Sequence, residues 1–252
     1  MKKLTILSVV ALCVMGLASA AMAQGTVSGT YWMPSTWKLE LKADAETYAI
    51  TIPGRGLSVS GDFAFAEKFG VSFAYSSISS TGNLTISGPG GSVEWNKSKA
   101  SGSYTMIDAA YKLYSDPVFS ISPAVGYFMA SSAIEGELVA EAGAPTKMSF
   151  DASGFKVGAK ATAVLMEGLE GYVSGGYVSS LTLRPTIDGT ACPEEQGTAV
   201  EFNGGVRYAV KVVPNLYVDG GYKYVSVTSK DEANNTSTLT TSGIYLGASY
   251  RF

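Results

Sequence analysis

The chain has 252 residues, of which 15% are charged, and its net charge is -3. This balance argues against nucleic-acid binding, which calls for a basic surface. Hydrophobic residues make up 46% of the chain and recur in alternation, which disfavours a helical bundle. Beyond the first 23 residues, no apolar run is long enough for a membrane-spanning helix.

The first 23 residues have the three parts of a secretory leader. Lys2 and Lys3 form a positive start, 4–17 is an apolar stretch, and Ala21-Met22-Ala23 is the small-x-small pattern that precedes cleavage. A membrane helix is the weaker interpretation, because the apolar stretch is short and nothing after it stops transfer. We therefore predict a signal peptide over 1–23, Sec-dependent export and a single mature domain over 24–252.

After the leader, strand-like runs are separated by short and long connections in alternation. Short ones such as Ser115-Asp116-Pro117 and Val213-Pro214-Asn215 contain the residues that tight turns require. The long ones cover 35–55, 80–100, 131–147, 181–197 and 229–240. Outer-membrane barrels alternate in this way, with tight periplasmic turns and longer extracellular loops.

This division predicts ten strands, and the alternative is eight if the first hairpin or the third strand is misread. The segment 37–52 also alternates, which would extend the first hairpin above the membrane. The predicted strands lie near 25–34, 56–66, 70–79, 102–114, 118–130, 148–165, 169–180, 198–212, 215–228 and 241–252.

Each run alternates between two chemically different faces. From Val200 to Val210 one face reads Val-Phe-Gly-Val-Tyr-Val, and from Glu201 to Lys211 the other reads Glu-Asn-Gly-Arg-Ala-Lys. A soluble sandwich alternates as well, but here the polar face mixes glycine and serine with charged residues, which suits a confined lumen. We predict an all-β fold, an antiparallel up-and-down transmembrane β-barrel in the outer membrane.

The end of the chain supports a membrane strand. Counting back by twos from Phe252 gives only apolar or aromatic residues as far as Ile244. An aromatic last residue on the apolar face is typical of a strand anchored at a lipid interface. Gly247, Tyr250 and Phe252 are the predicted C-terminal assembly signal.

Charged residues of the strands point into the lumen if the apolar face meets lipid. A three-residue turn at 213–215 would pair Val212 with Leu216, which places Asp219 opposite Ala209 and between Arg207 and Lys211. The predicted lumen charge cluster is Glu170, Arg207, Lys211, Asp219 and Arg251. Further expected lumen charges are Asp62, Asp108, Lys112, Lys156, Lys160, Glu201 and Lys223.

Such a cluster has two interpretations. It could be a salt-bridge plug that holds and seals the barrel, because small barrels are just wide enough for side chains to fill. It could instead be the constriction of a pore. We favour the plug, and so predict a structural or surface-interaction role through long extracellular loops. The alternative is a narrow channel for small solutes, hydrophobic ones included.

Several features together resemble a known group of barrels. They are the leader, the Gly-Gly-Tyr phrases at 175–177 and 220–222, the short and long connections and the final Ala-Ser-Tyr-Arg-Phe. The mature chain resembles the small outer-membrane barrels of the OmpA/OmpW/opacity-protein type, and its segment 29–35 is similar to their first strands. Those barrels usually have eight strands, and ten would depart from that pattern.

The resemblance implies a monomer in the outer membrane of a Gram-negative cell, exported by the Sec pathway. It implies contact with outer-membrane lipid and lipopolysaccharide, and delivery to the barrel assembly machinery by the C-terminal strand. No nucleic-acid partner is expected.

The residue types do not favour catalysis. The chain has no histidine, which is the commonest general base and metal ligand. Outer-membrane phospholipases, lipid-A deacylases and omptin proteases share a barrel architecture but rely on a histidine. After cleavage Cys192 is the remaining cysteine, and a lone thiol is neither a disulfide nor a catalytic dyad. We predict no catalytic residue, no metal site and no cofactor.

Overall fold

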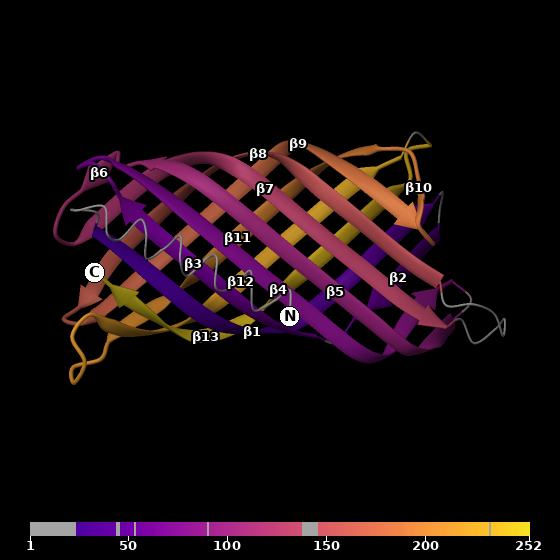
Figure 1. The fold of residues 1–252 in the computed structure, drawn as a ribbon, viewed down its shortest axis with the longest axis horizontal. Coiled ribbons are helices and arrows are strands. Elements are labelled where there is room, and N and C mark those ends of the chain that lie inside the picture. Colours follow the sequence, from indigo (N-terminus) through magenta and orange to yellow (C-terminus); the bar gives the residue numbers. More distant parts are fainter. Residues whose placement is uncertain (1–23, 44–45, 53, 90, 138–145, 232) are drawn as a thin grey trace.

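The computed structural model describes residues 24–252 except 44–45, 53, 90, 138–145 and 232, so the predicted leader lies outside the described residues. The chain forms a long, closed, antiparallel β-barrel whose strands are tilted to its axis (Figure 1). No helix in the described part of the chain could cross a bilayer.

Ten passes of the chain build the barrel, which confirms the predicted number of strands. β2 and β3 together make the second pass, and β6 and β10 are two-residue pieces beside turns. The elements are β1 (Gln24–Ala43), β2 (Glu46–Thr51), β3 (Arg55–Ala64), β4 (Phe69–Gly88), β5 (Gly91–Tyr111), β6 (Tyr114–Ser115), β7 (Phe119–Glu137), β8 (Thr146–Met166), β9 (Leu169–Ile187), β10 (Thr190–Ala191), β11 (Glu195–Ala209), β12 (Leu216–Lys230) and β13 (Thr236–Arg251).

The first and last strands close the barrel. β1 pairs with β13 from Thr26↔Arg251 to Lys42↔Thr236. Beyond this register, Phe252 and Gly25 exchange both backbone hydrogen bonds, at 2.9 and 3.0 Å. The C-terminus lies at the same end of the barrel as β6, and β2 and β10 lie at the other end (Figure 1). The end with the tight turns is the periplasmic end by the general plan of such barrels.

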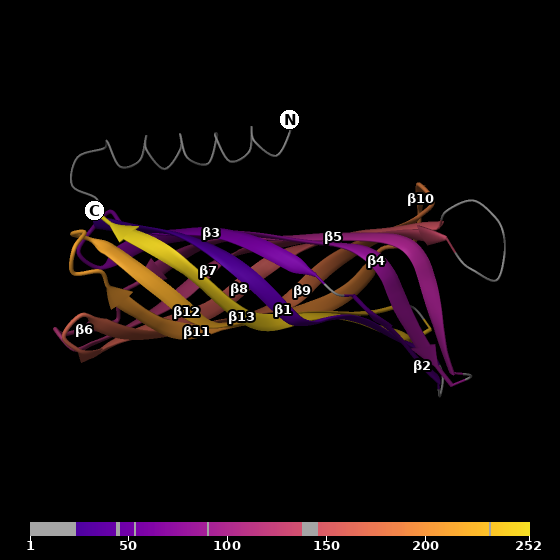
Figure 2. The ribbon, with the colours of Figure 1, turned by 90° about the horizontal axis from the view of Figure 1, so that it is seen from below.

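The long extracellular connections differ from the prediction, because most of their residues are strand. β4 and β5 continue to Gly88 and Gly91, and β12 and β13 continue to Lys230 and Thr236. The segment 37–52 is the β1–β2 hairpin, as its alternation predicted. The strands therefore extend well past the length that a membrane needs and build a second, extracellular half of the barrel (Figure 2).

The apolar residues point outward in the periplasmic half of the barrel and inward in the extracellular half, as β12 illustrates. Its odd-numbered residues from Asp219 to Ser229 point inward, and most of them are buried. From Leu216 to Tyr224 the outward residues are apolar and the inward ones polar, whereas beyond Tyr224 the outward residues are Ser226 and Thr228 and the inward ones Val225 and Val227. The apolar residues thus change faces without any break in the strand.

The apolar outer band fixes which part of the barrel spans the bilayer. On β12 it covers Leu216 to Tyr224, close to the roughly 9–11 residues of a tilted transmembrane strand. Exposed aromatics such as Tyr31, Tyr127 and Tyr177 lie toward the extracellular edge of this band on other strands, as expected of an interfacial girdle. The periplasmic half therefore lies in the membrane, and the extracellular half stands above it.

On β1 a bulge accompanies the change of face. The register with β13 shifts between Pro34 and Thr36, so Trp32 and Trp37 both point inward although their positions differ by an odd number, five. Proline has no N–H to contribute to a ladder, and it is found at such irregularities. Both indole rings are almost fully buried, at 0% and 1% exposure.

Candidate functional site

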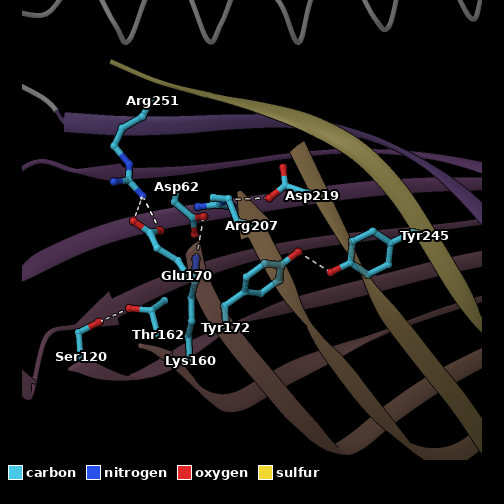
Figure 3. Close-up of polar contacts among 10 residues, drawn as sticks. All are labelled: Asp62, Ser120, Lys160, Thr162, Glu170, Tyr172, Arg207, Asp219, Tyr245 and Arg251. Atoms are coloured by element: carbon cyan, nitrogen blue, oxygen red, sulfur yellow. Dashed lines mark hydrogen bonds and ion pairs between the residues drawn. The ribbon is translucent and has the colours of Figure 1, made fainter. Parts of the chain in front are cut away.

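The lumen of the periplasmic half is crossed by ion pairs from strands that are not neighbours. Lys160 on β8 reaches Asp62 on β3, with Nζ 2.7 Å from Oδ2. Arg251 on β13 donates from Nη2 to both carboxylate oxygens of Glu170 on β9, at 2.8 and 3.1 Å. These contacts tie opposite walls of the barrel together (Figure 3).

A second ion pair joins neighbouring strands. Arg207 on β11 lies directly opposite Asp219 on β12, and its Nε donates to Asp219 Oδ1 at 2.7 Å. The Asp219 side chain is only 2% exposed. The guanidinium also lies over the rings of Tyr172 and Tyr217, at 5.3 and 5.9 Å from their centroids, which adds cation–π attraction.

Lys156 on β8 is held by two carboxylates. Its Nζ lies 2.8 Å from Asp108 Oδ2 on β5 and 2.7 Å from Glu201 Oε1 on β11. The lysine side chain is 4% exposed. A buried ammonium group is stable when charged partners and hydrogen bonds replace its hydration, so this three-residue clamp braces the middle of the lumen.

Tyrosines add a neutral brace. The hydroxyls of Tyr172 on β9 and Tyr245 on β13 are 2.5 Å apart. Tyr245 can cross the lumen because two glycines face its hydroxyl: a Cβ on Gly205 or Gly221 would lie 2.7 or 2.5 Å from that oxygen. Gly205 and Gly221 are opposite each other on β11 and β12, which explains the inward glycines of these strands.

Lys223 marks the inner limit of the polar lumen. It is 8% exposed, donates a hydrogen bond to the hydroxyl of Ser76 on β4 and lies 5.0 Å from the centre of the Trp32 ring. Ser76 also accepts a hydrogen bond from Ser58 at 2.8 Å. Above this level most of the buried inward side chains are apolar.

The apolar residues of the extracellular half form one continuous layer across the lumen. The Tyr104 ring lies between those of Trp32 and Phe128, with its centroid 6.4 Å from each of the other two. The Tyr104 hydroxyl spans the barrel to Thr241 at 2.7 Å. The buried members of the layer are Trp32, Trp37, Ile50, Ile52, Ile78, Leu84, Ala100, Tyr104, Met106, Phe128, Ala130, Ile134, Ala152, Val178, Leu181, Leu183, Ala199, Val225, Val227, Leu239 and Tyr245.

Between the braces lies a cavity of about 510 Å³. Its lining runs from Glu67 and Lys68 in the β3–β4 turn to Lys223, and it ends at Met106 and Tyr245 on the periplasmic side of the apolar layer. The cavity thus belongs to the membrane-spanning half and ends below the layer.

The predicted charge cluster is split into two separate ion pairs, Arg207–Asp219 and Arg251–Glu170. Its fifth member, Lys211, lies outside the lumen. Asp219 is opposite Arg207, not Ala209, so the predicted register is wrong by two residues. The connection runs from Val210 to Asn215 and contains two turns, with hydrogen bonds from Val213 N–H to Val210 and from Leu216 N–H to Val213. Lys211 falls in this connection and is exposed.

The other predicted lumen charges line the cavity. Lys112 lies just past the end of β5 and is exposed at the periplasmic rim. At the C-terminal signal, Tyr250 points outward with 48% exposure and the Phe252 ring lies 6.0 Å from that of Phe63. The remaining expected charges that line the cavity are Asp62, Asp108, Lys156, Lys160, Glu201 and Lys223.

Sequence reasoning missed the apolar layer, although a signal for it was present. Along β12 the alternation changes phase after Tyr224, where Val225 and Val227 take the positions that charged residues hold lower down. A fixed assignment of faces along the whole strand hides this change. The tyrosine brace was missed too, although Tyr245 is a large residue on the polar face.

A closed barrel with an apolar outer band and a charged lumen defines an integral outer-membrane protein. The family model described as "Outer membrane protein beta-barrel domain" matches residues 9–252. The chain belongs to this family, and it is a small barrel of the outer membrane of Gram-negative bacteria, as its resemblance to the OmpA/OmpW/opacity-protein type implied. None of the curated protein sequences matches the chain.

Among solved structures, similarity to the chain is found at low sequence identity, and OmpT shares its fold. The outer membrane protease OmpT from Escherichia coli is 11% identical with a TM-score of 0.69, over 91% of this chain and 97% of OmpT. OprG from Pseudomonas aeruginosa is 11% identical, over 91% and 96% of the two chains, with a TM-score of 0.44. Ail, the attachment invasion locus protein of Yersinia pestis, is 12% identical over 91% and 97%, with a TM-score of 0.34.

Proposed function

We propose that this protein is a sealed outer-membrane barrel with a structural or surface-interaction role, performed by its extracellular half. The single observation that carries the proposal is the apolar layer across the lumen. A water-filled channel requires a continuous polar path, and the layer from Trp32 to Phe128 interrupts that path in the part of the chain that the structure describes.

The extracellular half supports a surface role through rigidity. Its strands are paired almost to their ends, as in the register between Lys230 and Thr236, and its inside is filled with buried apolar side chains. Its outer face carries hydroxyl groups, including the cross-strand pairs Ser226–Thr240 and Thr228–Thr238 at 3.4 and 3.2 Å. Such a surface is a firm platform for contacts outside the cell, built from paired strands where we expected long loops.

Planar-bilayer recording of the purified protein tests this proposal. A sealed barrel should insert without producing reproducible single-channel currents. This should hold in solutions of small inorganic ions and in solutions of larger charged solutes. Insertion itself can be checked by heat-modifiable mobility of the recovered protein. Reproducible currents that depend on the solute would contradict the sealed barrel and support the second candidate, a narrow channel. The cavity of about 510 Å³ is the observation that favours this second candidate.

A further inference from the structure

We infer that the inner end of the lumen cavity is a binding site for a small anion with a carboxylate or phosphate group, and that Lys223 is its cationic contact. This site is independent of whether the barrel is sealed. It depends on the side chains that surround Lys223 and on the direction from which the cavity can be reached.

Lys223 differs from the other buried cations of the lumen. Lys156 and Arg207 each have carboxylate oxygens at 2.7–2.8 Å. Lys223 has none within 4 Å among the described residues; its contacts are the neutral hydroxyl of Ser76 and the face of Trp32. Burial of an ammonium group is unfavourable unless a negative partner meets it. An anion bound at this point would supply that partner and stabilise the charged form of Lys223.

Two acidic groups that line the same cavity are already engaged. Asp108 and Glu201 both bind Lys156, which leaves them to neutralise that lysine first. An ammonium group has three donors, and the hydrogen bond to Ser76 uses one of them. Lys223 therefore keeps donors for a ligand in the cavity that it lines.

Asn203 completes the site from the neighbouring strand. It lies directly opposite Lys223 in the β11–β12 register and lines the same cavity. An amide can donate through Nδ2. An ammonium and an amide side by side match two oxygens of a carboxylate or phosphate group.

The ligand would enter from the periplasm. The far end of the cavity is lined by Glu67 and Lys68 in a periplasmic turn and by Lys112 at the rim. The two lysines outnumber the glutamate there, which favours the approach of anions. The apolar layer blocks the opposite end, so the site is a blind pocket in the membrane-spanning half.

Calorimetric titration of the refolded protein in uncharged detergent tests the site, with sodium acetate and methyl phosphate as probes at constant ionic strength. Wild type and the control variant Lys211→Gln, whose exposed residue lies outside the cavity, should bind at least one probe saturably, and the stronger probe shows which group the site takes. Lys223→Gln keeps a hydrogen-bonding group but loses the charge, and should bind about tenfold more weakly.

A second readout comes from the Trp32 indole, whose ring lies 5.0 Å from Lys223 Nζ. Probe binding should change the tryptophan fluorescence of wild type, and Trp32→Phe should remove most of that change. Asn203→Leu should weaken binding as well and stands in for Lys223→Gln if that variant does not fold, which heat-modifiable mobility reports. The inference is overturned if neither probe binds wild type saturably, or if the folded Lys223 or Asn203 variant binds as wild type does.

Discussion

Arg207 and Asp219 face each other across the β11–β12 ladder, with Nε and Oδ1 2.7 Å apart and the aspartate almost completely buried. The Asp219 Oδ2 atom is buried as well and has no hydrogen-bond partner in the structure. Each charge of this pair is neutralised by the other, so removal of either side chain leaves an unpaired charge inside the lumen.

Asp219→Ala should therefore lower the free energy of unfolding by about 3–5 kcal/mol, the usual cost of breaking a buried ion pair. Urea unfolding of the refolded protein in lipid or detergent measures the loss. Asp62→Ala is the matched control, since the Asp62–Lys160 pair is 42% and 38% exposed and should contribute no more than about 1 kcal/mol. Equal losses in the two variants would contradict the role assigned to Asp219.

The seal should depend on the apolar layer and not on the salt bridges. Phe128→Ala removes a side chain that is 1% exposed and should cost about 3–5 kcal/mol through the cavity it leaves. Combined with Trp32→Ala, it should produce measurable conductance in planar bilayers, while Asp219→Ala should stay silent. Phe155→Ala is the control, because this lipid-facing ring is 80% exposed. Currents through Asp219→Ala alone would move the seal to the ion pairs.

The border of the membrane on β12 can be located with single cysteines in a Cys192→Ser background. Labels at Val218 and Tyr222 should be quenched by lipid-soluble quenchers, because both residues face outward within the apolar band. Labels at Ser226 and Thr228 should respond to water-soluble quenchers, because the outer face is polar there. A lipid-soluble response at Thr228 would place the bilayer higher than the change of face indicates.

The C-terminal residue should matter for assembly. Phe252 closes the barrel with two backbone hydrogen bonds to Gly25 and places its ring beside Phe63. Deletion of Phe252 removes the last step of the β1–β13 ladder and should reduce the amount of heat-modifiable barrel in the membrane fraction. Phe252→Tyr retains an aromatic ring and should assemble normally. Wild-type assembly of the deletion variant would show that the ladder closes without this residue.

One periplasmic turn should respond to acid. Asp116 accepts hydrogen bonds from the Tyr114 hydroxyl at 2.6 Å and from the backbone N–H groups of Phe119 and Val118 at 2.7 Å. These bonds, that from Tyr114 first, lower the pKa of Asp116 below its ordinary value. A lowered pKa stabilises the folded turn above the unfolded value of about 3.9, and this contribution disappears as the pH falls through the folded pKa.

NMR titration of the Asp116 carboxyl measures this effect directly. Tyr114→Phe removes the hydrogen bond that lowers the Asp116 pKa most, and should move that pKa back toward its ordinary value. Tyr48→Phe, in the extracellular β2 strand, should leave it unchanged. An Asp116 titration that is the same in wild type and Tyr114→Phe would show that the backbone donors alone hold the carboxylate.

Much of the fold could be predicted, because the faces of the strands and the positions of the turns depend on residues that are neighbours in the sequence. The alternation of residues from Val200 to Val210 revealed which face meets lipid, and Pro and Asn in the turns revealed where strands end. Period-two patterns translate directly into faces because successive side chains of a strand point to opposite sides. The number of strands and the lumen position of Lys156, Lys160 and Asp219 followed from this rule.

Only the tertiary structure decided which lumen residues meet and where the lumen closes. Lys160 finds Asp62 from 98 positions away, across a barrel whose diameter and tilt no single strand specifies. The register of Asp219 depended on whether the connection before Leu216 has three residues, 213–215, or six, 210–215, and a two-residue error moves every partner. The apolar layer exists because extracellular strands that face water outside bury their apolar side chains inside, so its position follows from where the bilayer ends.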